Sequence, residues 1–409
     1  MKRNAIVGQS GGPTAAINAT LAGVVKGALD APHIDTVYGM LNGIEGILED
    51  RFVDIGAQLG DEESLNLLKQ TPAAALGSCR KKLPKADDPS GKETFEKIFR
   101  FFEAHDIGFF FYIGGNDSMD TVAKLSKYAK ANGIDDISFV GVPKTVDNDL
   151  DGTSQTPGFG SAAKYIATTL QEILRDTAVY TVKAVTIVEI MGRDAGWLTA
   201  ASALCRLSSN VAPDLVYLPE VDFVLDAFYR DIEAAFEKHP NVVVAVSEGI
   251  RFADGRYVGE GTQSGVTDAF GHKYLQGVGK TLETCVKAHF GCKVRSVELN
   301  LPQRCAAHIL SANDINEAFR CGYSAATVAP DASGCLICYE RSDAPYSISF
   351  VPKDVSEIAN KIRKVPAAFI NEEGNNVTDE CLRYIAPLIE GEYPILYKNG
   401  LPCHFTVKK

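Results

Sequence analysis

A short apolar run, a polar or glycine-rich turn and a helical stretch follow one another three times in the first 150 residues. The apolar runs occupy residues 5–7, 108–113 and 137–142. Strands that alternate with helices predict a parallel sheet with helices on both faces. Ligands of such sheets bind beyond the carboxyl ends of the strands, which is where the three polar turns fall. The sequence therefore predicts an α/β fold whose turns converge on one crevice.

The alternation continues in the second part of the chain. Strand-like runs at residues 182–190, 241–246 and 294–301 each end in polar residues. They predict a second α/β domain that starts near Thr156, with the chain crossing back after Arg304.

The predicted fold class is α/β, with two Rossmann-like three-layer α/β/α domains and mostly parallel sheets. The active site is expected in the cleft between the domains. One domain is expected to comprise residues 1–155 and about 303–355, and the other about 156–302 and 356–409.

The first helix has apolar residues at helical spacing and is predicted from about Thr14 to Leu29. Pro13 is expected in its first turn, where the missing N–H has no cost. The second helix is predicted to end near Ala131.

Charge and hydropathy exclude several classes of partner. The formal net charge of −11 disfavours nucleic acid and anionic membranes, so an anionic substrate needs a local cluster of cations. No run approaches 18 uninterrupted apolar residues, so no membrane span is expected. The first apolar run is too short for a signal-peptide core, and the expected compartment is the cytoplasm.

Two motifs are interpreted without a functional role. Cys335 and Cys338 have the spacing of half a zinc site, but no second pair follows, and a buried strand explains them better. The segment from Gly277 to Thr281 is similar to the end of a P-loop. Tyr274 stands where the first glycine of that motif is required, so we interpret the match as a coincidence.

The segment that follows the third strand-like run has the richest chemistry. It contains Lys144, Thr145, Asp147 and Asp149 within six residues. Lysine is a point charge for phosphate, and a carboxylate can take a proton from an alcohol or bind Mg²⁺. An acidic turn that caps a helix is the alternative for such a cluster alone. Glycine turns before the first two helices are also suited to phosphate, because they let it approach the helix N-terminus.

Four motifs, in this order and at strand ends, resemble those of the phosphofructokinase family. They are Ser10-Gly11-Gly12, Gly114-Gly115-Asn116-Asp117-Ser118, Pro143-Lys144-Thr145-Val146-Asp147-Asn148-Asp149 and Met191-Gly192-Arg193. The resemblance covers about residues 4–305, and the tail is similar to that of the pyrophosphate-using branch. It implies the reversible transfer of a phosphoryl group from pyrophosphate to the 1-hydroxyl of D-fructose 6-phosphate in glycolysis. The domain with residues 1–155 is then expected to bind the phosphate donor, and the other domain the sugar phosphate.

The resemblance also implies roles for single residues. Asp147 is expected to be the general base for the sugar 1-hydroxyl, and Arg304 to bind the 6-phosphate through its guanidinium. The expected catalytic residues are Asp147, Lys144 and Asp117. The expected donor contacts are Gly11, Gly12, Arg80, Gly115 and Ser118. The expected sugar-phosphate contacts are Thr145, Val146, Asp149, Met191, Gly192, Arg193, Glu248, Arg295, Leu301 and Arg304.

Two positions favour pyrophosphate over ATP as the donor. ATP-using members have glycine where this chain has Asp117 and Lys144. A carboxylate at Asp117 repels an α-phosphate, whereas Lys144 can neutralise a terminal phosphate. The alternatives are an ATP-dependent phosphofructokinase and a catalytically silent regulatory subunit that binds sugar phosphate.

Several departures from the family pattern affect the site. Asn116 stands where many relatives have aspartate, and we expect it to contact Mg²⁺ with help from Asp117 or from substrate oxygens. Leu301 replaces a histidine or tyrosine, which leaves room for another sugar phosphate. Ala184 stands at the position of a family arginine, and the adjacent Lys183 either replaces it or is solvated.

Arg295 matches an arginine that family members donate across a subunit interface. The resemblance therefore implies a homodimer or homotetramer in which a neighbouring chain completes each site.

Overall fold

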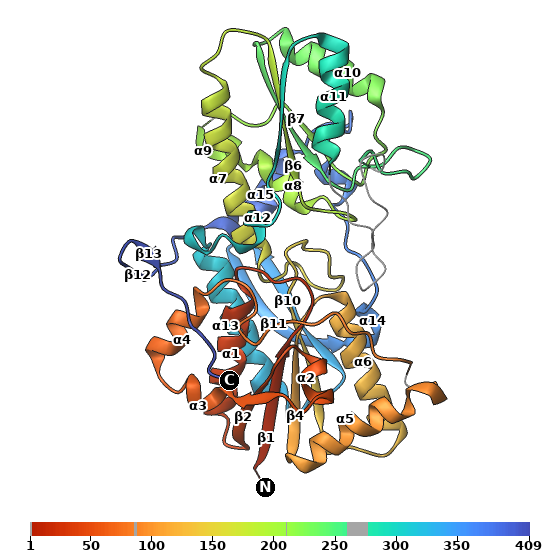
Figure 1. The fold of residues 1–409 in the computed structure, drawn as a ribbon, viewed down its shortest axis with the longest axis vertical. Coiled ribbons are helices and arrows are strands. Elements are labelled where there is room, and N and C mark those ends of the chain that lie inside the picture. The colour runs from red at the N-terminus through yellow and green to blue at the C-terminus, as the bar shows by residue number, and fades with distance from the viewer. Residues whose placement is uncertain (1, 86–87, 210, 260–276) are drawn as a thin grey trace.

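The computed structural model describes residues 2–85, 88–209, 211–259 and 277–409. Two parallel-stranded sheets form separate layers, one in the lower and one in the upper half of Figure 1. The predicted α/β class with two three-layer domains is confirmed.

The larger sheet has seven strands in the order β11-β10-β5-β4-β1-β2-β3. Its parallel strands are β1 (Arg3–Gln9), β2 (Ile34–Met40), β4 (Ile107–Gly114), β5 (Ser138–Pro143) and β10 (Cys335–Asp343). The antiparallel edge strands are β3 (Phe52–Asp54) and β11 (Tyr346–Asp354). β10 pairs with β5 although almost 200 residues separate them in the sequence.

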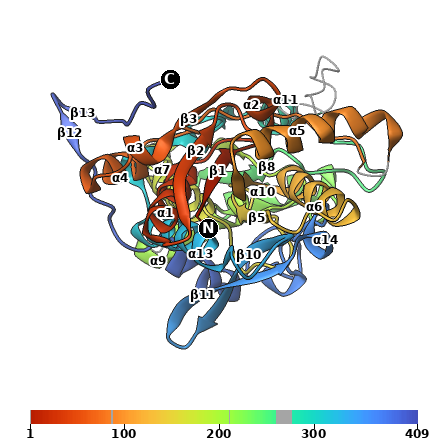
Figure 2. The same ribbon diagram turned by 90° about the horizontal axis from the view of Figure 1, so that it is seen from below.

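Helices cover both faces of this sheet, and Figure 2 shows them on its two sides. The helices of one face are α1 (Ile17–Asp30), α3 (Ile55–Gln58), α4 (Glu62–Lys69) and α13 (Ala312–Val328). Those of the other face are α2 (Ile44–Leu48), α5 (Lys92–Ala104), α6 (Asn116–Ala131) and α14 (Val355–Ile358). Apolar side chains between each helical layer and the sheet are almost fully buried, which is the main stabilising term.

The smaller sheet has four parallel strands in the order β7-β8-β6-β9. They are β6 (Ala184–Ile190), β7 (Leu215–Tyr217), β8 (Asn241–Ser247) and β9 (Lys293–Glu298). One face packs on α7 (Phe159–Thr177), α8 (Trp197–Ala201) and α15 (Asp379–Ile385). The other packs on α10 (Leu225–Phe236) and α11 (Val278–Phe290). The remaining elements are α9 (Arg206–Ser209), α12 (Pro302–Cys305), β12 (Tyr397–Lys398) and β13 (Leu401–Pro402).

The first helix starts later than predicted. α1 begins at Ile17, so the chain from Thr14 to Ala16 precedes the helix, and Pro13 is not in its first turn. The turn after β1 is therefore longer than expected, and it places Gly11 and Gly12 at the edge of the sheet.

The C-terminal tail divides its contacts between the two sheets. Val377 and Leu382 pack in the core beside the smaller sheet. The end of the tail returns to the larger sheet, where Gln70 Nε2 donates to the carbonyls of Leu396 and Cys403 at 3.1 and 2.7 Å (Figure 1). This differs from the expected assignment of all of 356–409 to the second domain, since hydrogen bonds to a distant glutamine leave no periodic sequence pattern.

Among the described helices, none combines the length and the apolar character that crossing a bilayer requires.

Candidate active site

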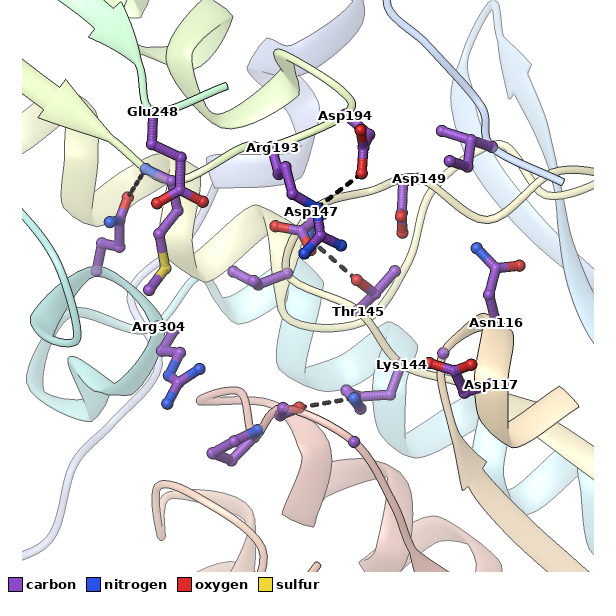
Figure 3. A pocket seen from close by; sticks show the side chains of 18 of the residues that line it. Asn116, Asp117, Lys144, Thr145, Asp147, Asp149, Arg193, Asp194, Glu248 and Arg304 are labelled. Carbon is purple, nitrogen blue, oxygen red and sulfur yellow. Dashed lines mark hydrogen bonds and ion pairs between the residues drawn. The ribbon is translucent and has the colours of Figure 1, made fainter. Parts of the chain in front are cut away.

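A cleft of about 640 Å³ lies between the two sheets. The carboxyl ends of β1, β4 and β5 line one wall, and those of β6, β8 and β9 line the other. The convergence of strand ends that the sequence predicted is therefore observed, and Figure 3 shows the cleft from close by.

Lys144 connects the first and third turns. Its Nζ donates a hydrogen bond of 2.6 Å to the carbonyl oxygen of Gly12. Gly11 has φ +78°, and a Cβ there would lie 3.2 Å from Nζ, so glycine is needed for this approach. Burial lowers the pKa of Lys144 to about 8, although Asp147 and Asp149 oppose that shift. The cleft thus holds a buried cation whose charge an incoming phosphate would stabilise.

An ion pair lies at the end of the cleft beside α6, where the phosphate donor is predicted to bind. Lys82 Nζ is 3.0 Å from Oδ1 of Asp117, which stands in the first turn of α6. Arg80 also lines the cleft, as predicted. Lys82 was not predicted from the sequence, because its ion pair with Asp117 joins two separate segments of the chain.

Residues 144–149 follow β5 directly and are called the catalytic loop here because of the role predicted for Asp147. The backbone N–H of Asp147 donates to Oγ1 of Thr145 at 3.2 Å, and Asn148 has the left-handed φ of +55°. This turn directs Asp147 and Asp149 into the cleft (Figure 3).

The two carboxyl groups of this loop share a buried, electrostatically crowded space. Burial raises the pKa of Asp147, while Arg193 and Lys144 act against that shift. Burial and the charge of Asp147 raise the pKa of Asp149 to about 7. A carboxyl group with a raised pKa is a better proton acceptor when ionised, which suits a general base.

Asp194 joins two arginines on the opposite wall. Its carboxylate accepts from Arg193 Nε at 2.9 Å and from Arg251 Nη2 at 2.5 Å. Both arginines hold the pKa of Asp194 below its usual value, against the effect of burial. Asp194 was not predicted from the sequence, although this residue directly follows Arg193, a predicted contact residue.

Glu248 and Gln303 orient the loop after β6. The N–H of Gly192 donates to Glu248 Oε1 at 3.3 Å, and that of Met191 donates to Gln303 Oε1 at 3.2 Å. A Cβ at Gly192 would lie 2.6 Å from the carbonyl of Ala195, so the turn requires glycine. Gln303 was not predicted, because its role is a contact with a backbone N–H of another segment.

The structure describes both motifs that were interpreted without a functional role. The N–H of Gly279, in the first turn of α11, donates to Glu189 Oε2 at 2.7 Å. A carboxylate of this chain therefore occupies the N–H that would bind a phosphate in a P-loop. Tyr274 lies outside the described residues. Cys335 and Cys338 are buried free thiols on β10, as expected.

Most of the predicted site residues line one cleft. They are Gly11, Gly12, Arg80, Gly115, Asn116, Asp117, Ser118, Lys144, Thr145, Val146, Asp147, Asp149, Met191, Arg193, Glu248, Leu301 and Arg304. Asp194, Lys82, Glu189, Glu298 and Asn360 line it too and were not predicted as contacts. Their roles toward substrates stay predictions.

Two predicted residues lie outside the lining. Gly192 holds its place through its bond to Glu248. Arg295 is exposed on β9, an edge strand, near Lys293 and Tyr180 at the end away from the cleft. That position is open to a second chain, and its role across an interface stays a prediction. Lys183 is exposed and does not line the cleft, which agrees with the solvated alternative, and its Nζ lies 5.0 Å from the ring centre of Phe236.

Asn116 has a polar atom without a partner. Its Oδ1 is buried and has no hydrogen bond among the described residues. Figure 3 places Asn116 between Asp117 and Asp149. Among the described residues, no group of three or more His, Cys, Asp or Glu side chains could hold a metal ion alone. One amide oxygen beside carboxylates fits Mg²⁺, which keeps waters and uses substrate phosphates as ligands.

Comparison with known proteins agrees with this geometry. Residues 4–329 match the phosphofructokinase family. The chain belongs to the phosphofructokinase family. It is 40% identical over 406 residues to the pyrophosphate–fructose 6-phosphate 1-phosphotransferase of Halomonas elongata, covering 98% of this chain and 95% of that protein. The enzyme of the same name from Methylococcus capsulatus is 38% identical over 410 residues, with 99% and 96% covered.

A solved structure supports the same assignment. The crystal structure of pyrophosphate-dependent phosphofructokinase from Nitrosospira multiformis superposes with a TM-score of 0.87 at 36% identity, covering 98% of this chain and 95% of that chain. The family that the four motifs predicted is thereby confirmed.

One acidic group of this chain, Glu248, predicts a pH-dependent stability. Burial raises the pKa of Glu248 to about 8 from 4.5, so the folded state retains a proton that the unfolded chain loses above pH 4.5. The free energy of unfolding from this group therefore falls as pH rises toward 8. We expect the gain in the free energy of unfolding from Glu248→Gln to be at least about 1 kcal/mol larger at pH 8.5 than at pH 5. Urea unfolding at both pH values measures this.

Glu233→Gln on the exposed side of α10 is the matched control and should be neutral at both pH values. An equal gain for Glu248→Gln at pH 5 and 8.5 would contradict the titration account.

Proposed function

We propose that this chain catalyses the reversible transfer of a phosphoryl group from pyrophosphate to the 1-hydroxyl of D-fructose 6-phosphate, giving fructose 1,6-bisphosphate and phosphate. The observation that carries this proposal is one cleft that brings together Asp147, Lys144, Asp117, Arg193 and Arg304, with Arg193 beside Asp147 and the guanidinium of Arg304 near Gly12 (Figure 3). The names of the relatives and of the superposed structure support it.

In this mechanism, the carboxylate of Asp147 accepts the proton of the sugar 1-hydroxyl. The oxygen of that hydroxyl group attacks the nearer phosphorus of pyrophosphate at the same time. The bond to the bridging oxygen breaks, and orthophosphate leaves with the electron pair. Lys144 and Arg80 offset the negative charge of the donor, and Arg304 binds the 6-phosphate. Catalysis rests mainly on positioning and electrostatic stabilisation.

Magnesium is the proposed cofactor. The phosphofructokinase family generally uses Mg²⁺, and Asn116, with Asp117 or Asp149 beside it, would hold the ion in this chain. When bound, Mg²⁺ neutralises phosphoryl oxygens of the donor.

The ion pair at the donor end supports pyrophosphate over ATP. A nucleotide would have to continue past the transferring phosphates into the space where Asp117 and Lys82 meet. The carboxylate there repels an α-phosphate, so the donor is limited to two phosphate groups.

Oligomerisation belongs to the same proposal. Arg295 lies on an exposed edge strand, where a second chain can approach it. The proposed assembly is therefore a homodimer or homotetramer in which Arg295 reaches the cleft of a second chain.

The test is fructose 1,6-bisphosphate formation by the purified chain with Mg²⁺ and either pyrophosphate or ATP. Turnover with pyrophosphate and not with ATP is the expected result. Turnover with ATP alone would support the ATP-dependent alternative, and activity with neither donor would support the silent regulatory subunit.

A further inference from the structure

The catalytic loop needs support from outside its own residues. Between β5 and α7 the chain has no regular helix or strand, and Asn148 is fully buried in the left-handed region. Asp147 and Asp149 repel each other there. A loop with this backbone and these charges keeps one geometry only if other groups bind its carbonyl oxygens.

Arg363, from the C-terminal segment after α14, binds consecutive carbonyls of this loop. Its backbone N–H donates to the carbonyl of Asp149 at 2.8 Å, and its Nη1 donates to that of Asn148 at 3.3 Å. An antiparallel bridge between Leu150 and Ile362 continues the contact. One short segment therefore holds Asn148 and Asp149 of the loop and the residue that follows them.

The guanidinium of Arg363 is itself fixed by the second domain. It lies 4.3 Å from the ring centre of Trp197 on α8, and Nη2 donates to Tyr384 Oη on α15 at 2.8 Å. Trp197 Nε1 in turn donates to the carbonyl of Arg363 at 3.1 Å, and Tyr384 Oη donates to that of Ser154 at 2.5 Å. Trp197 is fully buried, so its ring is a fixed platform.

Burial of the Arg363 guanidinium costs free energy on folding. Its named hydrogen-bond partners are carbonyl oxygens and a phenol, which are neutral, and burial lowers the pKa of Arg363. A largely buried charge with neutral hydrogen-bond partners is a net cost to folding. Its hydrogen bonds therefore indicate a role other than stability.

This arrangement also joins the two walls of the cleft. The loop after β6 contains the acceptor contacts Met191 and Arg193 and leads directly into α8, whose first residue is Trp197. A series of contacts therefore connects the loop after β6 with the catalytic loop through Trp197 and Arg363.

We propose that Arg363 is a positioning residue for phosphoryl transfer: it fixes the loop of Asp147 and Asp149 by binding its carbonyl oxygens from a platform on the second domain. The inference rests on the proposed function and extends it to a residue that touches no substrate. Losing the guanidinium lets the carboxylates move, and a displacement of about 1 Å costs up to about 100-fold in rate.

The test compares Arg363→Met, which keeps the apolar stem, with Arg363→Lys, which keeps the charge without the planar fork. We expect kcat to fall about 30–100-fold in Arg363→Met and less in Arg363→Lys, with KM for both substrates within about threefold. Guanidinium ion at low, non-denaturing concentration should restore part of the kcat of Arg363→Met and leave that of Arg363→Lys unchanged.

Arg341→Met is the matched control. Arg341 lies 4.1 Å from the ring centre of the same Tyr384 and donates to its carbonyl, yet its hydrogen bonds do not involve the catalytic loop. This variant should keep kcat within about twofold. Unchanged kcat in both Arg363 variants, or an equal loss in Arg341→Met, would overturn the proposal. If Arg363→Met does not fold, the kcat of folded Arg363→Lys decides. A wild-type chain without pyrophosphate turnover would instead refute the proposed function, and this inference with it.

Discussion

Replacing Asp147 by asparagine is expected to lower kcat with pyrophosphate by about 10²–10⁴-fold, the range that a general base contributes. Asparagine has nearly the same shape but cannot accept the proton of the sugar 1-hydroxyl. The loss of charge also removes a negative neighbour that raises the pKa of Lys144. Steady-state rates at pH 7, with both substrates saturating, measure the effect.

Asp151→Asn is the control for this variant. Asp151 follows the catalytic loop but does not line the cleft, so its kcat should stay within about twofold. A kcat for Asp147→Asn within threefold of the wild type would show that another group takes the proton.

Replacing both Asp117 and Lys144 by glycine is expected to reduce kcat/KM for pyrophosphate by about 10²–10³-fold, because a buried charge that meets the donor is lost. It also removes the carboxylate that Lys82 contacts at 3.0 Å, so the end of the cleft becomes more open. ATP should then inhibit at lower concentration than in the wild type. Rates over a range of pyrophosphate concentrations, with and without ATP, give both values.

Lys26→Ala with Asp30→Ala removes an exposed ion pair on α1 and is the control for changing two charges. Unchanged pyrophosphate turnover in the Asp117 and Lys144 double variant would exclude these residues as donor selectors. Thermal unfolding of the variant separates loss of function from loss of fold, since Lys144 is buried.

The positions that the sequence predicted well are those set by local pattern. Strand ends of a parallel sheet meet at one edge, so Gly11, Gly115 and Lys144 could be placed in one crevice from periodicity and turn residues alone. The family motifs then supplied expected roles for them.

The positions that it missed depend on contacts between segments far apart in the chain. Asp194 is defined by its second arginine, Arg251, and Lys82 by its ion pair with Asp117. Neither pairing leaves a spacing in the sequence. The same holds for Arg363, whose partners Trp197 and Tyr384 become neighbours only after both sheets have formed.

The place of β10 in the larger sheet has a consequence for synthesis on the ribosome. Residues 3–143 supply five of the seven strands, but β10 and β11 span residues 335–354 and pair at the edge of β5. Until those residues leave the exit tunnel, the nascent chain presents β5 as an unpaired apolar edge, while the whole of the smaller sheet is being made. Exposed edges of this kind invite association with other chains. The interval between the synthesis of residue 143 and that of residue 354 is therefore when this protein most needs a chaperone.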